Sequence, residues 1–292
     1  MKRHNGRDAA LFLAPTAVTY AVFLYIPIVS CFVIAMSDYD ILSPLNFIGF
    51  SNFKRLFTYD RTLSTYLTTF KLAGMVVILH TIIGLMMALI VRHFHRRFQS
   101  VLRSIYYLPS ILTTASVAIA WRYIFHSDLG ILNYFLRQLG LSNIPWLLDP
   151  QWVYGSIAVF SVWKFVGGAF LYYLIGLETI PESLYEAAKI DGAGSVSTFR
   201  HITLPMLTPT IFFVVLNLCI GATQMFDEPF FLTGGGPGDA SRTVNLFLYE
   251  VAYKEFNFGY ASAIAISLFF VLAIFTIVQV KASNKWVTYD RA

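Results

Sequence analysis

The sequence has few charged residues and almost no cysteine. Of its 292 residues, 13% are Asp, Glu, Lys or Arg, whereas soluble globular proteins contain about 25%. Charges this sparse could not cover the surface of a soluble enzyme of the same length. Cys31 and Cys219 both lie in apolar segments and indicate no disulfide framework. Aromatic residues make up 17% of the chain, a share that excludes intrinsic disorder.

Patterns typical of catalysis, nucleotide binding or metal binding are also missing. The glycine-rich segment Thr233–Gly238 lacks the Gly-Lys-Ser/Thr ending of a phosphate-binding loop and is typical of a tight turn. The histidines do not have the spacing of metal ligands. The net charge of +5 comes without a dense basic stripe, so nucleic acid is not an expected partner. We therefore expect a chain that is not an enzyme and that holds no metal or cofactor of its own.

Long apolar runs are what the sequence has instead. A helix needs about 20 apolar residues to cross a bilayer, and lipid forces such runs to be helical because it offers the backbone no hydrogen-bond partner. The sequence predicts an all-α integral membrane protein with six spans, close to Leu11–Met36, Leu72–Val91, Ile105–Phe125, Trp152–Gly176, Leu207–Phe226 and Ala261–Val280. With no low-complexity linker or internal repeat, we expect 1–292 to form one transmembrane domain.

The distribution of basic residues predicts the orientation. The short segment between the second and third runs holds Arg92, Arg96, Arg97 and Arg103. Cytoplasmic loops carry an excess of Lys and Arg, so this segment is assigned to the cytoplasm. An even number of spans then places both termini in the cytoplasm.

A predicted cytoplasmic loop, about 177–205, lies between the fourth and fifth spans. Pro181 suits the start of a short helix, and Gly192 and Gly194 suit its end because glycine tolerates a positive φ. We expect Gly192 to adopt such a conformation. Ser195 can cap a second short helix, which Pro205 should end as the fifth span begins. The residues alone are equally consistent with an interfacial helix pair and with a plug that docks into another protein.

The loop resembles the EAA loop of permease subunits of ABC importers. Glu186-Ala-Ala, three residues, Gly192, nine residues and Ile202-Thr-Leu-Pro205 match its pattern. Leu232-Thr-Gly-Gly-Gly-Pro237 and Phe258-Gly-Tyr-Ala-Ser-Ala263 are similar to further motifs of the maltose-type and glycerol-3-phosphate-type permeases. The resemblance implies the six-span fold of type I importers. It also implies that the loop couples the permease to an ATPase, and that the coupling residues are Glu186, Ala187, Ala188, Asp191, Gly192, Ile202, Leu204 and Pro205.

The same resemblance implies partners and a location. The chain would be a multi-pass subunit in the cytoplasmic (inner) membrane of a prokaryote, in contact with membrane lipid and paired with a second homologous permease, in a heterodimer. A cytosolic ATPase dimer would bind ATP and Mg²⁺, and an extracytoplasmic solute-binding protein would deliver the solute. The implied solute is a sugar, oligosaccharide or related polyol.

Polar residues in the spans mark a candidate solute path, because such groups are costly in lipid. Lys164 lies within the fourth span, and Asn217, Gln224 and Glu228 form one helical stripe at the fifth. Tyr172 offers an aromatic face for a sugar ring. The alternative is that these groups hold helices or the partner permease together. A secondary transporter or channel is the alternative function, although carboxylates for ion coupling are missing from the span centres.

Overall fold

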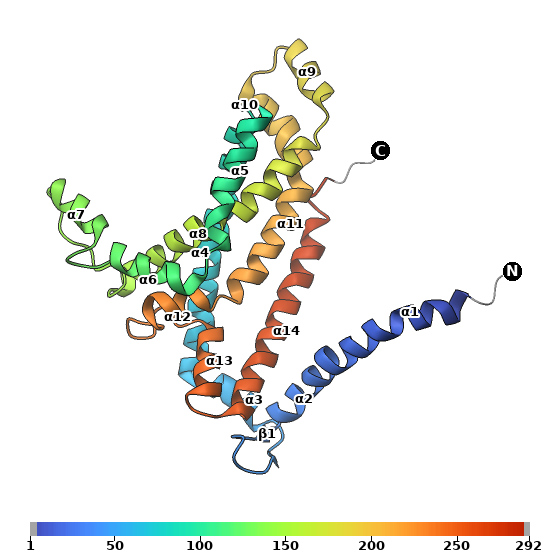
Figure 1. The fold of residues 1–292 in the computed structure, drawn as a ribbon, viewed down its shortest axis with the longest axis vertical. Helices are drawn as coiled ribbons and strands as arrows, with labels where there is room; N and C mark the ends of the chain where they lie inside the picture. Colours follow the sequence, from blue (N-terminus) through green and yellow to red (C-terminus); the bar gives the residue numbers. More distant parts are fainter. Residues whose placement is uncertain (1–4, 289–292) are drawn as a thin grey trace. The chain divides into compact units, whose positions relative to one another are not determined.

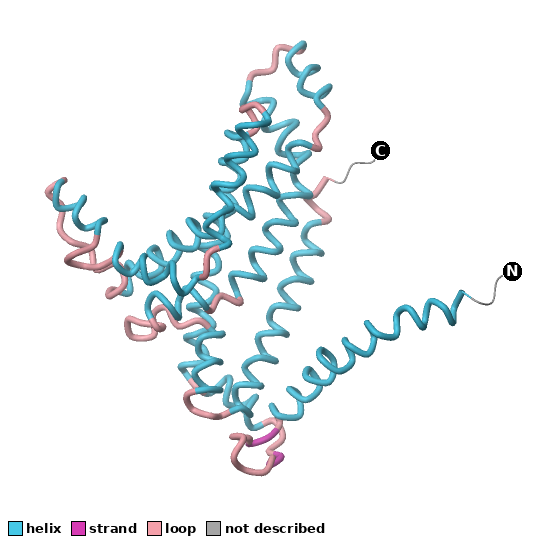
Figure 2. Tube along the Cα trace, in the orientation of Figure 1, coloured by secondary structure: helices cyan, strands magenta, loops and turns pink. Residues whose placement is uncertain are grey.

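The computed structural model describes residues 5–288, which form helices, connecting loops and one small β-hairpin (Figures 1 and 2). In this described part, five helices are long and apolar enough to cross a membrane, and each contains most of one predicted span. Their bounds are Ala10–Ala35, Asp60–Val91 (α4), Pro150–Glu178 (α8), Ser195–Thr223 and Phe258–Ser283 (α14). The all-α membrane fold is therefore confirmed. The chain ends, which we expect to share one side, lie outside the described residues.

The predicted span Ile105–Phe125 is broken into two helices, so one continuous helix was the wrong prediction. α5 (Arg96–Ile111) and α6 (Thr114–Ile124) meet at an angle of 94°. Pro109 cannot donate a hydrogen bond to the preceding turn, and Leu112 and Thr113 have extended backbone angles. Apolar length alone did not reveal the break. Taken together, the pair passes the length and hydropathy criteria for a sixth, bent span.

Two of the long helices contain a π-helical turn, which in each case ends two residues before a proline. The segments are α1 (Asn5–Tyr20), η1 (Ala21–Tyr25) and α2 (Ile26–Ala35) in one helix, and α10 (Ser195–Thr198), η2 (Phe199–Thr203) and α11 (Leu204–Thr223) in the other. Pro27 and Pro205 lack an N–H, and the i→i+5 bonds of a π turn let a later residue donate instead. The helix therefore continues through Pro205. The prediction that Pro205 ends a separate short helix is wrong.

Backbone contacts divide the chain into two compact units. The first unit comprises 1–63 and 247–270, and the second comprises 64–246 and 271–292. Compactness does not measure whether the units fold separately, so the single domain expected for 1–292 stays a prediction.

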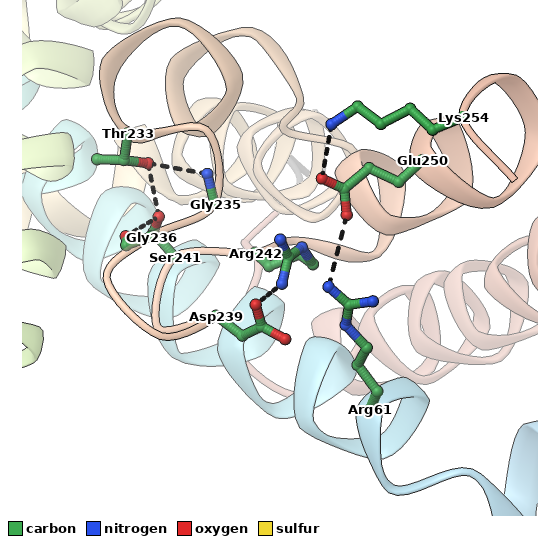
Figure 3. Close-up of polar contacts among 9 residues, drawn as sticks. All are labelled: Arg61, Thr233, Gly235, Gly236, Asp239, Ser241, Arg242, Glu250 and Lys254. Atoms are coloured by element: carbon green, nitrogen blue, oxygen red, sulfur yellow. Dashed lines mark hydrogen bonds and ion pairs between the residues drawn. The ribbon is translucent and has the colours of Figure 1, made fainter.

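In the first unit, a hairpin of β1 (Ser37–Asp38) and β2 (Asn46–Phe47) follows α2, and α3 (Ser51–Thr58) comes next. Buried Asn52 on α3 donates from its side-chain amide to the carbonyls of Ala35 (3.0 Å) and Ser37 (2.9 Å). The first bond satisfies the carbonyl of Ala35 at the end of α2, and the second satisfies that of Ser37 at the start of β1. Glu250 pairs with Lys254 at 3.0 Å and with Arg61 at 4.0 Å (Figure 3).

In the second unit, α8 is the central helix. It packs against α5, α11 and α12 (Asp227–Thr233), and a large share of its residues are buried (Figure 1). A Cβ on Gly167 would lie 2.3 Å from the carbonyl oxygen of Tyr106, so glycine there permits the close approach of α8 and α5. The connecting helices are α7 (Ile131–Gln138), α9 (Glu182–Ile190) and α13 (Val244–Tyr253), of which the last begins in this unit.

Candidate functional site

A cavity of about 520 Å³ lies in the second unit, where α8, α11 and α12 meet α4. Asn217, Gln224 and Glu228 line it together, as the helical stripe predicts. The other polar or aromatic lining residues are His80, Ser161, Phe165, Tyr172, Phe226 and Asp227. The cavity thus combines amide, hydroxyl and carboxyl groups with aromatic rings. Such a mixture suits a neutral solute that carries many hydroxyl groups, and the assignment of individual residues to its path stays a prediction.

The C-terminal end of α11 is held by side chains that the sequence analysis did not select. Gln224 follows the last residue of α11, and its backbone carbonyl accepts a 2.7 Å hydrogen bond from the amide of Asn245. The hydroxyl of Thr243 donates to the carbonyl of Met225 at 2.8 Å. These two contacts fix the direction in which the chain leaves α11, and hence the placement of Gln224 against the cavity. Because the donors come about twenty residues later, helical periodicity could not indicate them.

The glycine-rich turn places those donors. Thr233 and Ser241 share a hydrogen bond between their hydroxyl groups at 2.7 Å, and Ser241 donates to the carbonyl of Gly236 at 2.6 Å (Figure 3). Arg242 pairs with Asp239 across the same turn (Figure 3). The segment therefore forms a closed loop directly before Thr243, as expected for a tight turn.

Glu228 is a buried carboxyl group at the edge of the cavity, with 7% of its surface exposed. Burial raises its pKa from 4.5 to about 7, because ionisation is disfavoured away from water, and the neighbouring Asp227 adds to this. The charge of Lys164 and a hydrogen bond from Ser161 act in the opposite direction. The carboxyl group can therefore donate or accept a hydrogen bond near neutral pH.

Lys164 lies outside the set of described residues that line this cavity. Its side chain is only 1% exposed, and its Nζ donates to the carbonyls of Leu112 at 2.5 Å and Pro109 at 3.2 Å. The amine also lies 4.8 Å from the centre of the Phe165 ring. The Pro109 carbonyl also accepts the N–H of Leu112 at 3.3 Å, so Lys164 is a second donor to it. The Leu112 carbonyl lies beyond the last residue of α5, and the cation therefore occupies the negative end of this helix. The structure therefore gives Lys164 a structural partner in addition to the predicted role in the path.

The predicted coupling loop begins with α9, which ends in a Schellman motif. Gly192 has φ +72°, which confirms the expected left-handed conformation. Its N–H donates to the carbonyl of Lys189, and the N–H of Ala193 donates to that of Ala188. Gly194 has φ −73°, so the second glycine needs no left-handed conformation. Ser195 begins α10 and does not cap it with its side chain, contrary to expectation.

The predicted coupling residues divide into an exposed group and an inner group. Glu186, Ala187, Asp191 and Gly192 are exposed, whereas Ala188 is buried and Ile202, Leu204 and Pro205 are half-buried. Two apolar side chains of the loop point away from the chain's own core, because Ile190 is 85% exposed and Val196 is 81% exposed. An apolar surface of this kind is available for another protein.

The base of the loop is fixed to α4 through a contact that the sequence did not reveal. The Arg92 guanidinium lies 4.7 Å from the centre of the Tyr185 ring and donates to its hydroxyl at 3.1 Å. The hydroxyl groups of Tyr185 and Thr203 lie 3.2 Å apart. This chain of contacts joins the end of α4 to α9 and to η2. A movement of α9 would therefore be transmitted to two of the long helices.

In the described part of the chain, no group of three or more His, Cys, Asp or Glu residues is placed to hold a metal ion.

Comparisons with known proteins agree on one family. Residues 80–288 match the family described as "Binding-protein-dependent transport system inner membrane component". The trehalose/maltose transport system permease protein MalF of Thermococcus litoralis is 32% identical over 285 residues, which cover 97% of this chain and 96% of that protein. The arabinooligosaccharides transport system permease protein AraP of Bacillus subtilis is 32% identical, with 94% and 88% covered.

A solved structure has the same fold. A chain in the crystal structure of a bacterial ABC transporter involved in the import of the acidic polysaccharide alginate has a TM-score of 0.84 to this chain. It is 23% identical, and the alignment covers 97% of this chain and 98% of that one. The likeness shows a shared fold over nearly the whole length of both chains.

Proposed function

Since this chain belongs to the family of binding-protein-dependent transport system inner membrane components, we propose that it is one of two permease subunits of an ATP-driven importer for a sugar, an oligosaccharide or a related polyol. The observation that carries the choice of solute is the lining of the 520 Å³ cavity, where amide and carboxyl groups lie beside aromatic rings. The hydroxyl groups of a sugar can form hydrogen bonds with these amide and carboxyl groups, and the apolar face of its ring can pack on the aromatic rings. The names of MalF and AraP support the same class of solute.

The proposed partners are those that the resemblance to ABC importer permeases implies, and the exposed apolar residues of the loop support one of them. A cytosolic ATPase dimer, which binds ATP and Mg²⁺, would receive the loop formed by α9, Gly192 and α10, with Ile190 and Val196 as its apolar contacts. A second homologous permease, in a heterodimer, would complete the solute path. An extracytoplasmic binding protein would supply the solute. In this arrangement both termini face the cytoplasm of a prokaryotic cell, and the spans lie in its inner membrane.

The proposed mechanism is alternating access. ATP binding closes the ATPase dimer and moves the loop, and the contacts of Tyr185 with Arg92 and Thr203 transmit this movement to α4 and α11. The solute then enters the cavity from outside, where Asn217, Gln224 and Glu228 bind it. Hydrolysis returns the complex to its inward-open state. This chain supplies the solute path and the contacts that connect it to the ATPase, whereas the ATPase dimer hydrolyses ATP.

The test is uptake by proteoliposomes that contain the complete complex, with ATP inside and binding protein outside. A panel of labelled saccharides and polyols should yield at least one solute whose uptake requires both components. Gln224→Leu should lower uptake of that solute about fivefold, since one lost hydrogen bond contributes about 1 kcal/mol, while the ATPase still co-purifies. Gln138→Leu makes the same change at the exposed end of α7 and should leave uptake unchanged. Uptake that persists without the ATPase would reject the proposed function.

A further inference from the structure

A second cavity, of about 800 Å³, lies at the end of the spans that carries the arginine-rich segment. It is formed where α4 ends, where α5 begins, where α8 ends and where α9 begins. Its lining residues are Arg92, Arg96, Gln99, Ser100, Arg103, Leu177, Glu178, Ile180, Glu182 and Tyr185. Neither the solute path nor the exposed tip of the coupling loop includes this cavity.

Three guanidinium groups and two carboxyl groups line the cavity, and they are not all paired. Arg103 pairs with Glu178, and its Nε is buried without a hydrogen-bond partner. Arg92 is occupied by Tyr185. Among the described residues, Arg96 has no acidic side chain within ion-pairing distance. The cavity therefore keeps a net positive charge and unused donors, of the kind that bind a phosphate oxygen in a planar, two-pronged geometry.

The position of the cavity indicates where such an anion would come from. α4 ends at Val91, α5 begins at Arg96 and α8 ends at Glu178, so the cavity lies at the boundary between the apolar spans and water. Phospholipid headgroups occupy this level of a bilayer, and basic pockets between span ends bind anionic ones. The buried side chains of Leu177 and Ile180 add an apolar wall, which suits the glycerol part of a lipid.

We propose that this cavity binds a phosphate-bearing anion, with Arg96 and Arg103 as its ligands, and that the phosphodiester of an anionic phospholipid is its source. The site depends on the span ends alone and is independent of which solute is carried. Because Glu182 and Tyr185 of α9 also line the cavity, a bound headgroup would hold the base of the coupling loop. The lipid composition of the membrane would then set the stability of that loop.

The experiment uses the purified complex of permease and ATPase subunits, freed of co-purified lipid in a neutral detergent. Phosphatidylglycerol, phosphatidylcholine and inorganic phosphate are each titrated against it. Bound lipid is counted by native mass spectrometry, and thermal stability is followed in parallel. The test variant is Arg96→Gln, since Arg96 has no partner in the described chain whose loss could disturb the fold. Arg97→Gln is the matched control, because Arg97 is the adjacent exposed arginine and does not line the cavity.

We expect phosphatidylglycerol to bind and stabilise the wild-type complex, and phosphatidylcholine to have little effect. Arg96→Gln should weaken phosphatidylglycerol binding about fivefold or more, the loss expected for one arginine at an anionic surface, and Arg97→Gln should not. Stabilisation by inorganic phosphate that Arg96→Gln abolishes would confirm a phosphate site and assign its source to soluble phosphate. Equal losses in the two variants would overturn the proposal, since they would reflect diffuse surface charge. Equal binding of phosphatidylglycerol and phosphatidylcholine by the wild-type complex would also overturn the proposal.

Discussion

Two buried charged residues beside the solute cavity are stabilised in different ways. Glu228 avoids the cost of burying a charge by holding its proton up to a pH of about 7. Lys164 donates to two carbonyls at the break between α5 and α6, those of Pro109 and Leu112. Once Glu228 is ionised, above a pH of about 7, the charge of Lys164 also attracts it. Each residue therefore has its own measurable consequence.

The raised pKa of Glu228 predicts that the stability of the complex falls with pH. The folded state binds this proton more tightly than the unfolded chain, whose carboxyl has a pKa of 4.5. Stability is then lost as the pH rises from 4.5 to about 7, by about 3 kcal/mol from this group. Thermal unfolding of the solubilised complex should show this loss, and Glu228→Gln should remove it.

The control for Glu228 is the same substitution at an exposed carboxyl. Glu255→Gln should keep the wild-type dependence on pH, because Glu255 is exposed on the loop after α13. A Glu228→Gln complex with the wild-type pH profile would show that the pKa of this carboxyl is the same in the folded and unfolded states, and that the burial of Glu228 does not raise it.

Residue-level prediction from the sequence depended on periodicity. Asn217, Gln224 and Glu228 could be grouped because helical spacing places them on one stripe, and they do line one cavity. Lys164 could be selected because it is a charge within a span. Its partners could not be identified, because the carbonyls of Pro109 and Leu112 lie more than fifty residues away along the chain, at a helix break that the sequence did not reveal.

At the scale of elements, the break between α5 and α6 depends on Lys164. Lys164→Met would remove two charge-assisted hydrogen bonds, to the carbonyls of Pro109 and Leu112, with an expected cost of about 2 kcal/mol. Amide hydrogen exchange should accelerate in 110–117, and thermal stability should fall. Lys281→Met, at the exposed end of α14, is the matched control and should have neither effect. Unchanged exchange in Lys164→Met would show that the bend is held by other contacts.

The two glycines of the coupling loop offer a matched pair of substitutions. Gly192 has φ +72°, whereas Gly194 has φ −73°, and a Cβ on either would meet no atom within 4 Å. Gly192→Ala should therefore destabilise the end of α9 by about 1–2 kcal/mol through backbone strain alone, and Gly194→Ala should be tolerated. The measurement is solute-stimulated ATP hydrolysis by the reconstituted complex, which only Gly192→Ala should lower. Equal activity of the two variants would show that this turn does not contribute to coupling.

Elements were predictable where composition and local capping decide them. Five of the six runs form single long helices because apolar length alone specifies a span. The end of α9 was predictable because Gly192 permits the left-handed turn that a Schellman motif requires. The continuation of the helix through Pro205 could not be predicted, because a π turn that accommodates a proline has no pattern in the sequence.

At the scale of the whole molecule, the bent pair α5–α6 decides the topology of everything that follows it. If the pair crosses the membrane, the chain has six crossings and both termini face the cytoplasm. If α6 turns back, there are five crossings, and the residues after α14 lie outside. The family relationship gives the fold, whereas the side of each loop rests on the arginines of the 92–103 segment. Three exposed positions distinguish these arrangements.

The test is labelling of single cysteines in intact cells, in a variant without Cys31 and Cys219, by a thiol reagent that cannot cross membranes. Leu42 is 91% exposed in the hairpin loop, Leu139 is 74% exposed after α7, and Asn284 is exposed after α14. Cysteines at Leu42 and Leu139 should react, and one at Asn284 should react only after the cells are opened. A pair that turns back would shield Leu139 and expose Asn284, while Leu42 would still react. A chain with the opposite orientation would instead shield Leu42, so each arrangement gives its own labelling pattern.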